Sequence, residues 1–215
     1  MTRDKARGLL CIWTDIDPAH ESDFNRWYDR EHMQERVAIP GFQSARRFAA
    51  VGASPRPYLA LYYTDDLDVF RSQPYAKAFA NQTPWSLHNI ERMRGTQRRV
   101  GALTLETGEG EGGVLALFVV PAARAADASV LARLEQAIAA ATQQDLIVRG
   151  TLLRTDVPLS TPIAAGATPA PADALVMLEG SRIDAVRQRA QALAATVGVA
   201  GGDVHSFQLL WRRGS

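Results

Sequence analysis

The feature that most constrains the fold of this 215-residue chain is an order of strand and helix patterns that occurs twice. In the first half, strand, helix, strand, strand, helix and strand patterns occupy residues 9–16, 19–37, 42–51, 58–64, 67–80 and 97–105. In the second half, the same order occupies residues 114–120, 128–142, 146–154, 174–178, 182–197 and 205–211. The first strands of the two halves are separated by roughly 105 residues, so the halves are nearly in phase.

A unit with this order places both helices on one face of a four-stranded antiparallel sheet and leaves the other face uncovered. The second unit supplies the cover. We therefore expect an α+β fold in which two units, residues 1–107 and 113–215, pack sheet to sheet and close an eight-stranded barrel. The glycine-rich segment 108–112 is the expected linker.

The composition is that of an ordinary globular protein. Lysine and arginine number 24 and aspartate and glutamate 23, which leaves a formal charge of +1 and gives no indication of a nucleic-acid partner. No apolar run is long enough to predict a membrane span. The single cysteine, Cys11, cannot form an intramolecular disulfide, and we expect a cytoplasmic protein.

Three short motifs carry a family resemblance. They are Phe24-Asn25-Arg26-Trp27-Tyr28-Asp29-Arg30-Glu31-His32-Met33, then Ile39-Pro40-Gly41-Phe42, then Ala45-Arg46-Arg47-Phe48. With these motifs, residues 8–105 resemble the EthD-like branch of the dimeric α+β barrel superfamily. The resemblance implies two ferredoxin-like units.

Most members of this superfamily pair two single-unit chains, so the usual dimer interface would here be internal, and both a monomer and a homodimer stay open. Members include isomerases, cyclases, dehydratases, cofactor-free monooxygenases and haem-handling enzymes. Haem is therefore possible through the resemblance alone, and otherwise no cofactor is expected.

The first helix carries the candidate catalytic residues. At 100° per residue, the side chains within about 60° of Phe24 are Trp27, Tyr28, Glu31 and Glu35, with His32 near 80°. A carboxylate that faces a sheet indicates either a polar pocket or an ion pair. In the purely structural alternative, the counter-charges are Arg36, Arg46 or Arg47.

His32 is the candidate general acid or base, because its ordinary pKa of about 6.5 lies near working pH and it follows Tyr28 by one helical turn. Glu31 points about 100° away from His32, so the two do not form a simple hydrogen-bonded dyad. We predict His32, Tyr28 and Glu31 as catalytic residues. The alternative is an edge histidine that is bonded to backbone or solvent.

The predicted substrate-binding residues are Trp13, Trp27, Arg47, Tyr62 and Trp85. The four aromatic side chains of this set suit an apolar, ring-binding pocket with a few polar tips. For each of them, packing in the core without a role in binding is the alternative. The segment 83–88 has no counterpart in the second half and is expected either to close a pocket or to cover a sheet edge. The four histidines show no ligand spacing, so no metal site is predicted.

The second half provides a contrast. Its first helix carries Val130, Leu131, Leu134 and Ile138 in place of the polar and aromatic side chains, and it has no histidine. We therefore expect one functional pocket, in the first half. The Ala/Pro-rich segment 158–171 is expected to be a mobile surface loop or a lid.

These features predict a small-molecule enzyme that performs acid/base chemistry on an apolar or aromatic metabolite, by isomerisation, cyclisation or dehydration. The alternative from another class is a non-catalytic small-molecule-binding or stress-related barrel protein. A water-accessible pocket of a few hundred Å³ that touches His32 and the aromatic residues distinguishes the enzyme from the alternative.

Overall fold

The computed structural model describes residues 5–162 and 167–214. The strands are β1 (Gly8–Ile16), β2 (Phe42–Ala50), β3 (Tyr58–Thr64), β4 (Met93–Gly108), β5 (Val114–Val120), β6 (Ile147–Thr155), β7 (Ala174–Gly180) and β8 (His205–Gly214). The α-helices are α1 (Glu21–Trp27), α2 (Met33–Val37), α3 (Gln73–Ala80), α4 (Pro84–Arg92), α5 (Ala122–Ala125), α6 (Ala128–Ala141), α7 (Val157–Ser160) and α8 (Ile183–Thr196). Shorter turns are η1 (Pro18–His20), η2 (Tyr28–His32), η3 (Leu67–Arg71) and η4 (Gly201–Asp203).

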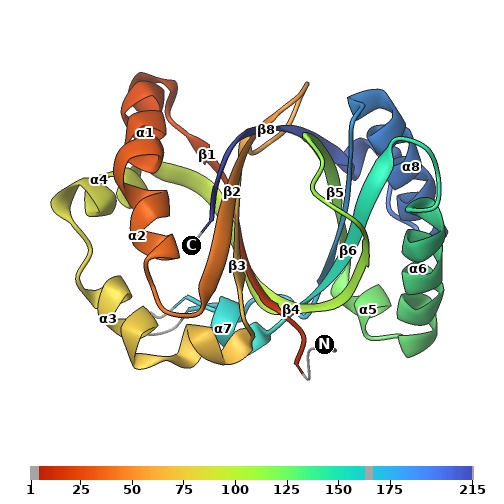
Figure 1. Ribbon diagram of the computed structural model, residues 1–215, viewed down its shortest axis with the longest axis horizontal. Helices are drawn as coiled ribbons and strands as arrows, with labels where there is room; N and C mark the ends of the chain where they lie inside the picture. Colours follow the sequence, from red (N-terminus) through yellow and green to blue (C-terminus); the bar gives the residue numbers. More distant parts are fainter. Residues whose placement is uncertain (1–4, 163–166, 215) are drawn as a thin grey trace.

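The eight strands form one closed barrel in the order β1-β3-β2-β8-β5-β7-β6-β4, and the paired strands are antiparallel (Figure 1). Strands β4, β1, β3 and β2 are neighbours, as are β6, β7, β5 and β8. The two groups join where β2 pairs with β8 and β4 pairs with β6. The predicted closed barrel with mixed helices and strands is thus confirmed, and it leaves no open sheet edge.

Alternation along the strands separates two apolar environments. On β1, Leu9, Cys11 and Trp13 belong to a cluster inside the barrel, whereas Leu10 belongs to a cluster under the helices. Successive side chains of a strand point to opposite faces, so one strand supplies both layers. The barrel interior is therefore a packed core.

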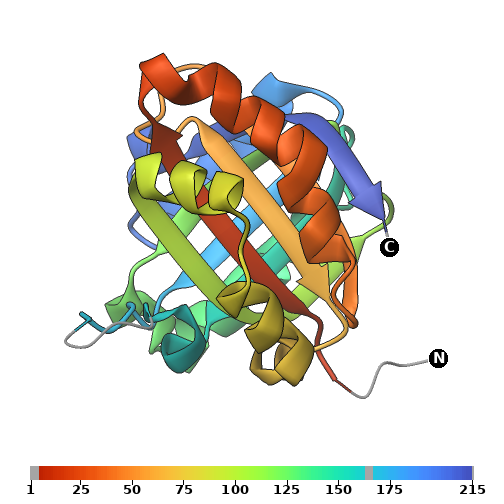
Figure 2. The same ribbon diagram turned by 90° about the vertical axis from the view of Figure 1, so that its left-hand side faces the viewer.

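The helices cover the outside of the barrel on two opposite sides. Helices α1 to α4 lie against the first group of strands, and α6 and α8 lie against the second (Figures 1 and 2). Helix α6 buries Val130, Leu131, Leu134 and Ile138, as its apolar spacing predicts. None of the described helices is long and apolar enough to cross a bilayer.

The helix predicted over residues 19–37 is not one regular α-helix. Between α1 and α2, residues Tyr28–His32 form a π-helical turn, so the angles assigned with 100° per residue do not hold beyond Tyr28. The segment 83–88 begins α4, whose first turn is capped by the Thr83 hydroxyl. It packs against α1 instead of covering a sheet edge.

The segment 158–171 begins as the helix α7, which Asp156 caps. The hydroxyl of Ser160 accepts from the amide of Val100 and donates to its carbonyl, which ties α7 to β4. This part of the expected loop is thus anchored, while residues 163–166 lie outside the described residues.

Candidate functional site

A cavity of about 660 Å³ lies between the outer face of β4, β1 and β3 and the helices of the first half. Its lining consists of Leu10, Ile12, Trp27, Tyr28, His32, Arg36, Tyr62, Phe70, Tyr75, Ala76, Phe79, Gln82, Ile90, Met93, Thr96, Arg98, Pro158, Leu159, Thr161 and Pro162. Most of these side chains are apolar or aromatic, and they surround a few polar groups, as in typical small-molecule sites.

The π-helical turn positions the aromatic wall of this pocket. The imidazole of His32 lies 4.2 Å from the Trp27 ring and 5.2 Å from the Tyr28 ring, measured between ring centres. The Tyr62 ring, on β3, faces it edge-on at 6.2 Å. π-helical turns occur frequently at functional sites, and this one holds the histidine over the sheet.

His32 is buried and electrically neutral. Burial lowers its pKa well below the ordinary value, and the nearby positive charges of Arg36 and Arg47 lower it further. Nδ1 is fully buried and has no hydrogen-bond partner among the described residues, which leaves Nε2 as the ring nitrogen that can reach a ligand. The neutral imidazole keeps a lone pair that can take a proton from an acidic ligand, and its lowered pKa makes it a weaker base than an ordinary histidine.

Two arginines bring positive charge into the same pocket. Arg36 is only 6% exposed and lines the cavity, and its side chain makes no ion pair or hydrogen bond within the described ranges. Arg98 donates to the carbonyl of Leu159 and to the hydroxyl of Tyr75. No aspartate or glutamate is among the described lining residues, so the pocket favours a ligand that carries or develops negative charge.

Two tyrosines face this pocket in their protonated forms. Burial raises the pKa of Tyr28, and it raises the pKa of Tyr62 well above the ordinary value. The Tyr62 hydroxyl is buried without a hydrogen-bond partner among the described groups. Both hydroxyls are therefore hydrogen-bond donors at neutral pH.

The structure brings together Trp27, Tyr28, His32 and Tyr62 of the predicted site residues. Glu31 points away from this cavity towards α4, where one carboxylate oxygen accepts from the hydroxyls of Thr83 (2.5 Å) and Ser86 (3.2 Å). The same Ser86 hydroxyl accepts from the indole N–H of Trp27 at 3.0 Å. Glu31 thus supports the pocket wall from behind.

Arg47 and Trp85 also lie outside the cavity, next to the helix that carries its aromatic lining. The Arg47 guanidinium lies 4.3 Å from the Tyr28 ring centre and donates to Asn25 and Asp29. The Trp85 indole donates to both carboxylate oxygens of Asp23 at 3.2 Å. Neither side chain lines the cavity.

Trp13 lies on the other face of the sheet. It packs in the barrel interior against His205 and Phe207, and its indole donates to the carbonyl of Arg56. Trp13 therefore does not line the cavity that contains His32, because β1 directs odd-numbered side chains inward here.

Two of the three arginines considered as counter-charges for Glu31 and Glu35 are engaged elsewhere, and the third, Arg36, makes no ion pair within the described ranges. Arg46 pairs with Glu179 inside the barrel and Arg47 pairs with Asp29. The alternative of an ion-paired Glu31 is thus not what the structure contains. Partial burial raises the pKa of Glu35, and the charge of Glu31 raises it further.

Sequence reasoning did not place Arg36 or Arg98 in the pocket, and it did not say which pocket the segment 158–171 would cover. Arg36 was considered only as a counter-charge, although it follows His32 by four residues, a spacing that places both on one helical face. The stretch from Pro158 to Pro162 comes from the second half and closes one side of the pocket. No sequence signal links it to the first half, because the contact arises from barrel closure.

The second half has its own, smaller cavity of about 190 Å³ between α6 and α8. Its lining is Val130, Arg133, Leu134, Ala137, Thr196 and Val197, without a histidine or an aromatic residue. Among the described residues, no group of three or more His, Cys, Asp or Glu is placed to hold a metal ion.

Comparisons with known proteins identify the fold. The sequence matches no protein-family model and no curated protein. An anthrone oxidase-like protein is similar in structure, with a TM-score of 0.65, 13% identity and coverage of 98% of this chain and 94% of that one. A candidate monooxygenase of Lactobacillus acidophilus NCFM is similar with a TM-score of 0.59 and 9% identity, and the match covers 98% of this chain and 97% of that one.

A haem-binding protein from Thermus thermophilus is also similar, with a TM-score of 0.51, 12% identity and coverage of 96% of this chain and 92% of that one. This chain thus shares its overall fold with these three proteins. Fold similarity at such low identity does not assign an activity.

Proposed function

We propose that this chain is a small-molecule enzyme that moves a proton on an apolar, ring-bearing metabolite, with His32 as the proton-transfer group. The observation that carries the proposal is a neutral imidazole set in an aromatic cavity of about 660 Å³ that contains two guanidinium groups. A pocket of this size and lining suits a planar ligand, and a neutral imidazole can act as a base.

The proposed step is the removal of a proton from a carbon that is bonded to a carbonyl group or conjugated with it through an aromatic ring. Nε2 of His32 takes the proton, and the electron pair of the C–H bond moves to the carbonyl oxygen to give an enolate. The charge of Arg36 stabilises that enolate, because opposite charges attract strongly in a site that excludes water. Return of the proton to the enolate oxygen gives the enol tautomer and completes an isomerisation.

The electrostatics of His32 restrict the substrate. Its lowered pKa makes it a weak base, so efficient transfer requires a C–H bond that is already acidic. Aryl ketones that enolise readily meet this condition and match the aromatic lining. The similarity to an anthrone oxidase-like protein supports testing anthrone, a tricyclic ketone of this class.

We assign the remaining predicted residues by their position. Trp27 and Tyr62 contact the ring of the ligand, and the Tyr28 hydroxyl orients its oxygen. Glu31 and Arg47 are positioning residues, which act through Ser86 and Tyr28.

Haem fits these residues poorly. His32 is the one histidine among the described lining residues, and its Nδ1 lacks the carbonyl or carboxylate partner that usually orients an iron-bound imidazole. We therefore derive no step through haem.

The proposal extends to the organisation of the chain as a tandem fusion of two EthD-like, ferredoxin-like units, residues 1–107 and 113–215. Equivalent strand neighbours in the two halves support it, with β1 and β5 as the first strands. In such a fusion the interface between units is internal, so one chain can close the barrel.

The test is deuterium exchange. Anthrone and 2-tetralone are incubated with the protein in D₂O, and loss of the signal of the acidic benzylic CH₂ group of each ketone is followed by NMR. We expect wild type to accelerate exchange above buffer, and His32→Ala to lower the acceleration by at least about 10²-fold. His88→Ala is the matched control, because His88 is exposed on α4.

Binding of both ketones is measured in parallel by calorimetry. Tight binding without accelerated exchange would support the non-catalytic alternative, a carrier or sensor. Equal exchange by wild type and His32→Ala would remove His32 from the chemistry, and failure of both ketones to bind would contradict the ring-binding pocket.

A further inference from the structure

The barrel interior ends in a polar cluster that the proposed chemistry does not use. Its inward-facing members are Arg46 on β2, Tyr63 on β3, Arg149 and Thr151 on β6, and Glu179 on β7. Each of these side chains is at most 10% exposed. This cluster is on the opposite face of the sheet from His32, so it is separate from the pocket described above.

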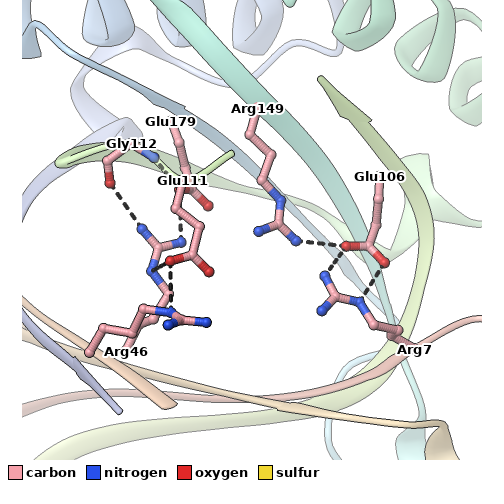
Figure 3. A network of polar contacts seen from close by, with 8 residues as sticks. Arg7, Arg46, Glu106, Glu111, Gly112, Arg149 and Glu179 are labelled. Atoms are coloured by element: carbon pink, nitrogen blue, oxygen red, sulfur yellow. Dashed lines mark hydrogen bonds and ion pairs between the residues drawn. The ribbon is translucent and has the colours of Figure 1, made fainter. Parts of the chain in front are cut away.

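The cluster takes part in two ion-paired groups, one around Arg46 and Glu179 and the other around Arg149 and Glu106 (Figure 3). On one side, Arg46 donates to Glu179 at 2.7 Å and to the carbonyl of Gly112 at 2.9 Å. On the other side, Glu106 accepts from both Arg7 and Arg149.

The charges of this network do not cancel. The positive members are Arg7, Arg46, Arg149 and Arg212, and the negative members are Glu106, Glu111 and Glu179. Arg212 pairs with Glu111 and Arg46 with Glu179, so Arg7 and Arg149 share the single charge of Glu106. One positive charge is therefore without a counter-charge in the network.

Several buried polar atoms of the cluster have no hydrogen-bond partner among the described residues. They are Tyr63 Oη, Thr151 Oγ1, Glu179 Oε1 and Arg46 Nε, although Nε lies 3.8 Å from Glu111. Buried polar groups are rarely left unpaired, and a group of them in one place indicates a bound water, ion or small molecule.

The unpaired donors and acceptors of the cluster indicate which kind of ligand would fit them. Burial and the charge of Glu179 raise the pKa of Tyr63 to about 12, so its hydroxyl is a donor at neutral pH. The Tyr63 and Thr151 hydroxyls are donors, and Arg149 uses only Nη2 for Glu106. Glu179 Oε1 can only accept a hydrogen bond. An oxyanion that carries a hydroxyl group can therefore accept from these donors and donate to Glu179 Oε1.

We propose that this end of the barrel binds one small monovalent oxyanion that retains a hydroxyl group, of the hydrogen carbonate class, between Arg149, Tyr63, Thr151 and Glu179. The anion supplies the missing negative charge and accepts from the hydroxyl and guanidinium donors, while its own hydroxyl donates to Glu179. The side chains of Arg7 and Glu106, which are 16% and 28% exposed, place the Arg149 side of the cluster near solvent.

The test measures thermal unfolding at pH 8 and constant ionic strength while sodium hydrogen carbonate replaces sodium gluconate. A ligand that binds only the folded state raises Tm with its concentration, and above Kd we expect about 3–6 °C for each tenfold increase. Tyr63→Phe keeps the ring under Arg149 but removes one donor, and we expect it to lose most of the rise. Thr151→Val removes the other hydroxyl at similar volume and is the second variant.

Tyr62→Phe is the matched control. It is the neighbouring residue, its hydroxyl is also buried without a partner among the described groups, and it faces the other side of the sheet. We expect it to keep the full hydrogen carbonate effect. The absence of any such effect in wild type, as ordered water alone would give, overturns the proposal, and so does an undiminished effect in both Tyr63→Phe and Thr151→Val.

Discussion

The imidazole of His32 lies with its centre 4.2 Å from the ring centre of Trp27, five residues earlier in the chain. In a regular α-helix, residues five apart point about 140° away from each other. The π-helical turn at Tyr28–His32 replaces that geometry, since its hydrogen bonds join residues five apart and bring them to one side. The pocket wall therefore depends on one extra residue in a helical turn.

Burial of His32 predicts an acid-sensitive fold. Its pKa in the folded protein is well below that in the unfolded chain, about 6.5, so below pH 6.5 the unfolded chain binds more protons. Stability is therefore lost as pH falls from 6.5 towards the folded pKa. We expect the free energy of unfolding, from urea titrations at pH 7 and pH 5, to fall less in His32→Gln than in wild type. Equal losses in both proteins would contradict a neutral His32.

Ser86→Ala tests the hydrogen bond that holds the indole of Trp27 in the pocket lining. The Ser86 hydroxyl is fully buried and accepts from the indole N–H of Trp27, so its removal leaves that donor unpaired. We expect a loss of about 1–3 kcal/mol in the free energy of unfolding, measured with urea. Ser54→Ala, in the turn between β2 and β3, is the control and should change stability by less. A loss confined to Ser54→Ala would contradict this role.

Much of the fold could be predicted from the sequence, because alternation and helical spacing are local signals. The buried stripe Val130, Leu131, Leu134 and Ile138 marks α6 directly. The π-helical turn could not be predicted, since no residue type specifies it and packing decides it. For that reason regular helical spacing placed Glu31 on the sheet-facing side, whereas its carboxylate contacts Thr83 next to α4.

The site was predicted in part for the same reason. Tyr28 and His32 carry their chemistry in a recognisable motif, whereas Arg98 and Leu159 reach the pocket from segments 61 residues apart. The position of Trp13 could not be predicted either, since an aromatic residue on a strand with two buried faces can pack on either face. The layer is fixed only when the barrel closes.

Arg36→Gln tests the stabilisation of negative charge in the pocket. The guanidinium is buried in the cavity without an ion-pair partner within the described ranges, so an anionic intermediate would be its natural counter-charge. Removal of one such group typically lowers kcat by about 10²–10³-fold. We expect this loss in the deuterium exchange of anthrone, with the free energy of unfolding unchanged or higher. Full exchange activity in the variant would contradict the assignment.

Arg99 and Asp173 join the two halves at the end of the barrel interior away from Arg149. Arg99 donates to both carboxylate oxygens of Asp173 at 2.8 to 3.1 Å, and both side chains are buried. Removal of one partner leaves the other charge buried and unpaired, so we expect Arg99→Gln to lose about 3–5 kcal/mol of unfolding free energy. The double variant with Asp173→Asn should recover part of that loss in urea titrations. Additive losses would contradict a coupled pair.

Gly101 lies where β4 approaches β6 too closely for a side chain. A Cβ at this position would be 2.0 Å from the carbonyl oxygen of Arg154, and a backbone atom in a barrel cannot move aside as a side chain end does. We expect Gly101→Ala to lower the free energy of unfolding by at least about 1–3 kcal/mol. Gly113→Ala is the matched control, because its Cβ would meet no atom within 4 Å among the described residues. A stable Gly101→Ala variant, equal to Gly113→Ala in urea, would show that β4 and β6 are farther apart than this register requires.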